Sequence, residues 1–380
     1  MQDPFDRDAW DALYDAQSED AEEQEKIRRE QIRVQESKTQ LRYVANRVGW
    51  ATAALIGVWV LSGIFLSTLA ELADMVGGGG FVAFFDRFLL IINELTLAAA
   101  LCVAAVVLLP VRRVNLHKEA ISFGRFLKFF MICLGAGYVG NLIGSVMLSF
   151  WNASTGNTVG DELVTLLSDG NPWLMVLSAA VLAPILEELF FRKLLTDRLR
   201  VFGETPSILL TALLFALFHQ SAEQFIYAFA LGILMGYFYC RTGNYWLTVL
   251  LHALFNFTMG VVPVLFLNTL SKFSLAMTEA FGADLSGMES MESDALLEAM
   301  MPILERYGLP IMLYALYAIA ILALEIAGIV LFAIRFGKFK ERKGEYSLPL
   351  KEAMKIVFKT PGVIFCTVAM SLMTVASLFL

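Results

Sequence analysis

Charged residues are scarce in this chain of 380 residues, since Asp, Glu, Lys and Arg together account for only 17% of it. An average soluble domain carries about 25% charged residues. Hydrophobic residues instead reach 58%, and the mean hydropathy is +0.65. This composition excludes an ordinary soluble globular protein and indicates an integral membrane protein.

Cysteine is rare as well, and motifs for nucleotide binding are missing. There is no phosphate-binding glycine loop, no nucleotide fingerprint and no convincing internal repeat, which weighs against an ATP-driven pump or an inverted-repeat transporter. The four cysteines form no CxxC pair and no metal-ligand spacing. Because they lie in or at the ends of apolar runs, we expect small buried side chains at Cys102, Cys133, Cys240 and Cys366.

What the sequence does contain is long apolar runs. A helix needs about 20 apolar residues to cross a hydrocarbon core of about 30 Å. We predict an all-α protein, a polytopic transmembrane helix bundle with about eight or nine spans and a cytoplasmic N-terminal tail. The runs occupy residues 49–70, 88–109, 126–150, 173–195, 206–221, 223–240, 245–267, 309–334 and 357–380.

These runs divide the chain into five parts. The tail contains helix formers and opposite charges at helical spacing, so we expect it to be helical. The parts are the cytoplasmic polar tail at 1–47, the N-terminal transmembrane helices at 48–170, a core of transmembrane helices at 171–267, an outer loop with short helices at 268–308, and the C-terminal transmembrane helices at 309–380.

Two of these parts lie between or before the spans. We expect the tail to fold onto the chain's own cytoplasmic loops, and a partner helix that docks on the tail is the alternative. We expect the outer loop to cover the outer face of the bundle with short helices, and a substrate-gating lid is the alternative. The apolar residues concerned are Trp10, Leu13 and Tyr14 in the tail and Leu296, Leu297, Met300, Met301 and Leu304 in the loop.

Basic residues indicate the orientation, because Lys and Arg mark the cytoplasmic loops. With the N-terminus inside, all of the 29 basic residues except Arg87, Lys272 and Arg306 fall in cytoplasmic segments. The loops at 151–172 and 268–308, on the other side, are acidic. We therefore predict a cytoplasmic N-terminus, an outside C-terminus and an inner surface suited to anionic lipid.

Ionisable residues gather in three spans, although burying such a group in hydrocarbon is costly. Residues four apart share one helix face, and this spacing recurs within each of the three spans. Glu187 lies about 100° around the helix from its neighbouring glutamate, so the two carboxylates have different roles. The pairs that share a face are Glu188 with Arg192, Phe215 with His219, and His252 with Asn256.

These polar groups also lie at similar depths. Counted inward from the predicted cytoplasmic ends of their spans, Glu187, His219 and His252 lie about 14 to 21 Å deep. A buried salt-bridge and hydrogen-bond network that fixes helix packing is the simpler interpretation of any single residue. Two carboxylates, an Arg, two His and an Asn converging at one depth favour a functional site.

The polar residues form three motifs in order along the chain: EExxxR at 187–192, FxxxH at 215–219 and HxxxN at 252–256. This ordered triple resembles the CPBP family of intramembrane proteases, the group of type II CAAX prenyl proteases and bacteriocin-immunity proteins. The resemblance covers about residues 170–260, and makes 171–267 a CPBP-like catalytic core. It implies a glutamate-dependent intramembrane endopeptidase.

The resemblance also implies a role for each polar residue. Glu187 and His219 activate a water molecule, and His252 and Asn256 stabilise the oxyanion. A carboxylate in a low-dielectric cavity is a stronger base than one in water. Donors aimed at the tetrahedral oxygen are the kind of preorganised stabilisation that speeds acyl transfer.

Other polar residues have supporting roles in this interpretation. Arg192 pairs with Glu188 and holds the helix in register, and Phe215 packs beside the histidine of its motif. Glu94 and Glu325 lie outside the motifs, and we interpret them as packing or cavity groups. The expected partners are membrane lipid and a membrane-associated peptide or protein substrate, without nucleic acid, and the expected location is a bacterial plasma membrane.

Two alternatives remain at this point. Glu187, His219 and His252 could supply the ligands of a catalytic zinc, as members of the family are often labelled metalloproteases. HExxH is absent and the two histidines come from different spans, so we favour a metal-free site without a cofactor. The alternative function is a catalytically silent membrane scaffold, or a transporter, that uses the same polar network.

Overall fold

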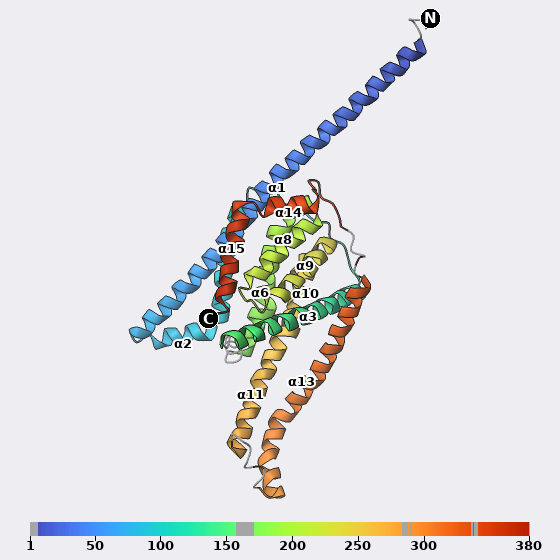
Figure 1. The fold of residues 1–380 in the computed structure, drawn as a ribbon. Helices are drawn as coiled ribbons and strands as arrows, with labels where there is room; N and C mark the ends of the chain where they lie inside the picture. The colour runs from blue at the N-terminus through green and yellow to red at the C-terminus, as the bar shows by residue number, and fades with distance from the viewer. Residues whose placement is uncertain are drawn as a thin grey trace.

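The computed structural model describes residues 7–156, 171–282, 288, 291–335, 337 and 341–379, and all regular elements within them are helices. The predicted all-α bundle is confirmed (Figure 1). In chain order the helices are α1 (Arg7–Met75), α2 (Gly79–Leu108), α3 (Phe123–Thr155), α5 (Pro172–Leu177), η1 (Ser178–Leu182), α6 (Ala183–Glu188), η2 (Leu189–Thr196), α7 (Asp197–Leu199), η3 (Arg200–Phe202), α8 (Glu204–Phe218), α9 (Phe225–Thr242), α10 (Tyr245–Asn256), η4 (Phe257–Val261), α11 (Val262–Phe281), α13 (Ser293–Arg335), α14 (Leu350–Val357) and α15 (Pro361–Ala376).

Among the described residues, seven helical stretches are long and apolar enough to cross a membrane, or eight if the bent pair α14 and α15 forms one span. The fifth predicted span corresponds to α8, which has only 15 residues and a length of about 22 Å. It begins after Gly203 (φ +114°) and ends before a turn at Gln220 (φ +50°). Most of its side chains are buried by neighbouring helices, so α8 packs inside the protein without the length of a full span.

The outward faces of the helices carry large apolar side chains, as contact with lipid requires. Leu61 in α1, Val106 in α2 and Ile319 in α13 are 63–67% exposed. Three of the four cysteines are buried as expected, but Cys102 is exposed because α2 turns it away from the bundle. The protein is therefore a multi-pass membrane protein by the length and composition of its helices.

Helix α1 runs for 69 residues and joins the polar tail to the first span. Figure 1 shows its N-terminal part projecting away from the bundle, so the expectation that the tail folds onto the loops is wrong. The helix continues because residues 7–48 contain neither Gly nor Pro. Residues 20–33 are exposed, and α1 first meets the bundle where Lys38 Nζ lies 2.7 Å from Glu352 Oε1. Tyr14 is 75% exposed, while the side chains at positions 10 and 13 are outside the described ones.

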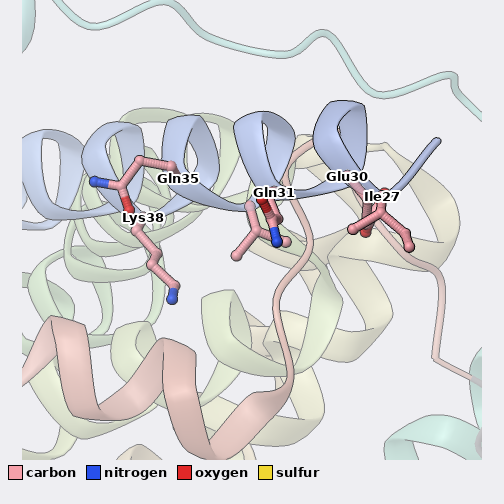
Figure 2. A pocket seen from close by; sticks show the side chains of 6 residues that line it. Ile27, Glu30, Gln31, Gln35 and Lys38 are labelled. Atoms are coloured by element: carbon pink, nitrogen blue, oxygen red, sulfur yellow. The ribbon is translucent and has the colours of Figure 1, made fainter. Parts of the chain in front are cut away.

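One face of α1 carries a shallow groove (Figure 2). Its lining comes from this helix alone, so it is a surface feature and not an enclosed ligand cavity. None of the polar motif residues contributes to it. The lining residues are Ile27, Glu30, Gln31, Val34, Gln35 and Lys38.

In the described part of residues 268–308, long helices take the place of the expected loop with short helices. Helix α11 continues to Phe281 and α13 begins at Ser293, so the two helices project together from the bundle (Figure 1). They contact each other, since the ring centroids of Phe266 and Tyr314 lie 3.6 Å apart and those of Phe273 and Tyr307 lie 6.1 Å apart. The apolar spacing correctly predicted that residues in this segment are helical. It did not predict that they continue the helices of the neighbouring spans, because the same spacing continues into the next span.

The basic segments lie together at one end of the bundle. Glu204 connects three of them, since Arg200 and Arg241 contact its two carboxylate oxygens at 3.0 and 2.6 Å. The backbone N–H of Arg342 donates to the same carboxylate at 2.9 Å, and the Arg342 guanidinium lies 3.3 Å from Glu119. The loops that the basic count assigned to one side of the membrane therefore share one side of the molecule.

Thiol labelling can test which side this is. Cysteines replacing Ser154 and Thr278, in a background without the four native cysteines, are expected to react with an impermeant thiol reagent added to intact cells. Ser154 lies near the end of α3, and Thr278 lies near the end of the helical stretch Tyr245–Phe281; both stretches start from the basic end. A cysteine at Glu36 is expected to stay protected until the membrane is permeabilised. The reverse labelling pattern would overturn the orientation.

The central helices form the core that positions the polar motifs. Phe190, Phe191 and Phe215 belong to one buried cluster built from η2, α8 and parts of α1 and α2. Helix α3 approaches α9 closely at Gly140, where a Cβ atom would lie 2.6 Å from Tyr227 Cα. Small residues permit this close packing between membrane helices, so α3 and α9 pack tightly beside the helices that carry the motifs.

Candidate functional site

The helical stretch from Pro172 to Phe202 carries the first motif and contains the π-helical turns η1 and η2. At the end of η1 the N–H of Ala183 donates to Ser178 O, five residues back. Pro184 follows and has no N–H, so it cannot continue this pattern onto Ala179 O. That carbonyl instead accepts a hydrogen bond from Asn256 Nδ2 at 3.0 Å. The break in the hydrogen bonding of this stretch thus connects the helix of the first motif to the third motif.

Glu188 connects its own helix to α10. Its side chain is fully buried, and Arg192 Nε lies 3.0 Å from Glu188 Oε2. His252 Nδ1 donates to Glu188 Oε1 at 3.0 Å. The contact with Arg192 is an ion pair by distance, although its N–H groups are not aligned as hydrogen bonds to any described residue. Glu188 therefore orients the His252 ring while Arg192 compensates its charge.

Glu187 has different surroundings from its neighbour. Its side chain is 11% exposed, and Glu187 Oε2 lies 3.9 Å from His252 Nε2. The same oxygen has no hydrogen-bond partner among the described residues. The 100° separation of the two glutamates predicted such a difference. Glu187 thus presents an acceptor oxygen that a small polar molecule can use.

His219 caps the C-terminal end of α8. Its Nδ1 donates to Phe215 O at 2.8 Å, because a backbone carbonyl is only an acceptor. In the neutral ring this leaves Nε2 as an acceptor. The rings of His219 and His252 both pack against the ring of Phe215, so α8 and α10 bring the two histidines to one site.

Phe215 lies at the centre of these side chains. Its ring packs edge-on against His219 with centroids 4.8 Å apart, and against His252 at 5.7 Å. The Arg192 guanidinium lies over it at 5.4 Å, a cation–π distance. Phe191, which the sequence did not single out, packs on the same ring at 5.1 Å. The contact with His219 was predicted, whereas the other three depend on how the helices cross.

Two further polar contacts lie outside the motifs. Ser178 Oγ donates to Glu94 Oε1 at 3.0 Å, and both side chains are buried. Tyr245 Oη donates to Ile185 O at 2.7 Å and ties the start of α10 to α6. Glu94 could be singled out as an acid in a span, but 84 residues separate it from Ser178, and helical spacing cannot connect residues so far apart.

The fit of these residues to a metal ion can be judged from their grouping. Among the residues that the structure describes, no three His, Cys, Asp or Glu side chains form a group able to hold one. His252 Nδ1 is bonded to Glu188 and His219 Nδ1 to a carbonyl, which leaves Nε2 of each ring as the atom available to a ligand. Glu187, His219 and His252 are the residues that would hold a zinc, and a site without a metal is a proposal taken up below.

Comparison with known proteins gives one match. Residues 169–258 match the family model described as Type II CAAX prenyl endopeptidase Rce1-like, which is consistent with the CPBP family. No curated protein and no solved structure gives a significant match to the chain. The matched range contains all three motifs, and it supports an intramembrane protease.

Proposed function

We propose that this multi-pass membrane protein, with its Rce1-like segment at 169–258, is an intramembrane endopeptidase that acts on a membrane-associated protein or peptide. The unpartnered Oε2 of Glu187, beside His252 Nε2, is the observation that carries the proposal. We propose that the N-terminus is cytoplasmic, since the basic segments share one end of the bundle, and that the membrane is a bacterial plasma membrane. The enzyme is of the glutamic type and works without a metal.

Glu187 is the base of the proposed reaction. Its free oxygen accepts a proton from a water molecule while the water oxygen attacks the scissile carbonyl carbon. His219, whose Nε2 remains an acceptor, shares this proton. The proton then passes to the leaving nitrogen, the C–N bond breaks, and a carboxylic acid and an amine are released. Burial of the site favours this chemistry because it removes competing bulk water.

His252 and Asn256 stabilise the oxyanion in this mechanism. Asn256 uses one amide hydrogen for Ala179 O, and the second hydrogen of the amide is available to the tetrahedral oxygen. Glu188 accepts a hydrogen bond from His252 Nδ1 and fixes the orientation of the ring, and in the proposed reaction His252 donates from Nε2 to the oxyanion. Two donors on successive turns of α10 then face the developing negative charge.

Truncation of Asn256 tests this role. Asn256→Ala is expected to lower kcat by about 10²-fold with little change in KM, because the donor acts on the transition state more than on the substrate. Asn152→Ala on α3 is the matched control and is expected to retain normal kcat. A loss confined to KM would contradict the oxyanion role. Loss of folded protein alone would assign Asn256 to the packing of η1.

The scaffold or transporter interpretation makes a different prediction and is kept as the alternative. If the protein is a protease, a peptide that matures in membranes with active protein is expected not to mature in membranes with Glu187→Gln. Quantitative proteomics of the two membrane preparations identifies this peptide. Identical peptide profiles would contradict the protease function. Ion flux that depends on an added substrate, in vesicles with purified protein, would instead support transport.

A further inference from the structure

Glu94 is a buried acid that the proposed reaction has not yet used. It lies in α2, outside the range of the family match, and is only 6% exposed. Helix α2 packs against η1, α6 and η2, the segments that carry the first motif. An ionisable group at this depth is costly and commonly serves function when it faces the protein interior.

One oxygen of Glu94 is fixed by the site. Oε1 accepts the hydrogen bond from Ser178, the first residue of η1. The next carbonyl of η1, Ala179 O, accepts the hydrogen bond from Asn256. The same π-helical turn therefore orients both Glu94 and a proposed oxyanion donor. A side chain held in this way has a defined direction for its second oxygen.

The second oxygens of Glu94 and Glu187 share one property. Each Oε2 is buried, and neither has a hydrogen-bond partner among the described residues. Glu94 lies on α2, which packs against α6, the helix that carries Glu187, so both carboxyl groups belong to one packed region. Buried acceptors of this kind are usually satisfied by protein or by ordered water, and a water molecule carries the two donors that such a pair requires.

We propose that Glu94 Oε2 and Glu187 Oε2 together hold the attacking water, so that Glu94 positions the nucleophile. The inference rests on the proposed protease function. One O–H of the water donates to each carboxylate, and the lone pair faces the scissile carbonyl. On attack, one proton passes to Glu187, where His219 shares it, and the other stays on the new hydroxyl group of the tetrahedral intermediate, bonded to Glu94. The proton on Glu187 then goes to the leaving nitrogen as the C–N bond breaks.

A structural role for Glu94 makes a different prediction. If Glu94 only fastened α2 to η1 through Ser178, its substitution would lower thermal stability and folded yield, and the turnover of each folded molecule would be unchanged. Glu325 provides the matched control, because it is a buried glutamate, 4% exposed, on α13, which packs against α3 and α11. Its substitution removes a similar carboxylate away from the proposed water.

The test uses full-length protein in detergent and a fluorescence-quenched peptide. This peptide spans the cleavage junction identified by quantitative proteomics of membranes with active protein and with Glu187→Gln. Glu94→Gln is expected to lower kcat per folded molecule by about 10- to 100-fold with KM within about twofold, because one hydrogen bond to the nucleophile is lost. Glu325→Gln is expected to change neither. The effects of Glu94→Gln and Glu187→Asp are expected to be less than additive, since both act on one water.

The outcomes distinguish a failure of this inference from a failure of the proposed protease function. Normal kcat in Glu94→Gln, while Glu187→Gln is inactive, would overturn this inference and leave the protease function standing. Full activity in Glu187→Gln would overturn the protease function itself. If Glu94→Gln does not fold, Ser178→Ala replaces it, since it frees Glu94 Oε1 and is expected to lower kcat about threefold to tenfold at constant KM. Normal kcat in Ser178→Ala would then contradict the inference.

Discussion

Glu187→Gln is expected to abolish peptide cleavage while the protein keeps its fold. The amide has the shape of the carboxylate but cannot accept the proton of the attacking water, so kcat should fall by about 10²- to 10⁴-fold. Glu187 Oε2 has no hydrogen-bond partner among the described residues, and its nearest charged contact, His252 Nε2, is 3.9 Å away. The substitution therefore removes little that holds the helices together, and the midpoint of thermal unfolding should stay within a few degrees of wild type.

Controls make this result specific to the base. Glu325→Gln, which also removes a buried carboxylate, should retain normal cleavage in the same assay. Strong chelators should leave the wild-type rate intact, and metal analysis of active protein should find far less than one equivalent. Stoichiometric zinc whose removal stops cleavage would replace the metal-free mechanism with a metalloprotease. Unchanged kcat in Glu187→Gln would remove Glu187 from the chemistry.

Local spacing predicted much of the arrangement within each helix. Arg192 is four residues from Glu188, and the two side chains lie 3.0 Å apart. His219 is four residues from Phe215, and the structure brings their rings together. Such contacts follow from the rise and turn of one helix, so a single sequence contains the information for them. The apolar runs predicted the helices themselves for the same reason.

Contacts between distant segments could not be predicted in this way. The bond from Asn256 to Ala179 O requires a carbonyl exposed by the π-helical turn before Pro184, and a proline in an apolar run is its only local sign. The partnership of Ser178 with Glu94 depends on how α2 crosses η1. Crossing angles are set by side-chain packing along the whole interface, which spacing within one helix does not encode.

The sequence also did not predict where several helices begin and end. The polar tail and first span form one helix because no breaker lies between them. Helices α11 and α13 also extend beyond the predicted span ends, and α13 does so although it contains Pro302 and Pro310. A hydropathy profile marks where the side chains become polar. It does not mark where the hydrogen bonds of the helix end. The profile therefore could not predict that α1 extends far beyond the apolar segment it contains.

Arg192→Ala is expected to be the most destabilising of these substitutions. Arg192 and Glu188 are both fully buried, and Arg192 Nε lies 3.0 Å from Glu188 Oε2. Removal of one partner leaves an uncompensated carboxylate in the bundle, which typically costs about 3–5 kcal/mol. The guanidinium also covers the Phe215 ring at 5.4 Å, and a cavity there adds to the loss. Folded yield, thermal midpoint and cleavage should all fall.

The replacement series distinguishes a packing role for Arg192 from a catalytic one. Arg192→Lys keeps the charge but lacks the planar group that covers Phe215, so it should restore part of the folded yield. Arg192→Ala combined with Glu188→Gln removes the uncompensated charge and should recover stability relative to Arg192→Ala alone. Cleavage should remain low in the double variant, because the amide no longer holds His252 Nδ1 as a carboxylate does. Wild-type thermal stability in Arg192→Ala, with cleavage alone lost, would instead place Arg192 in the chemistry of the site.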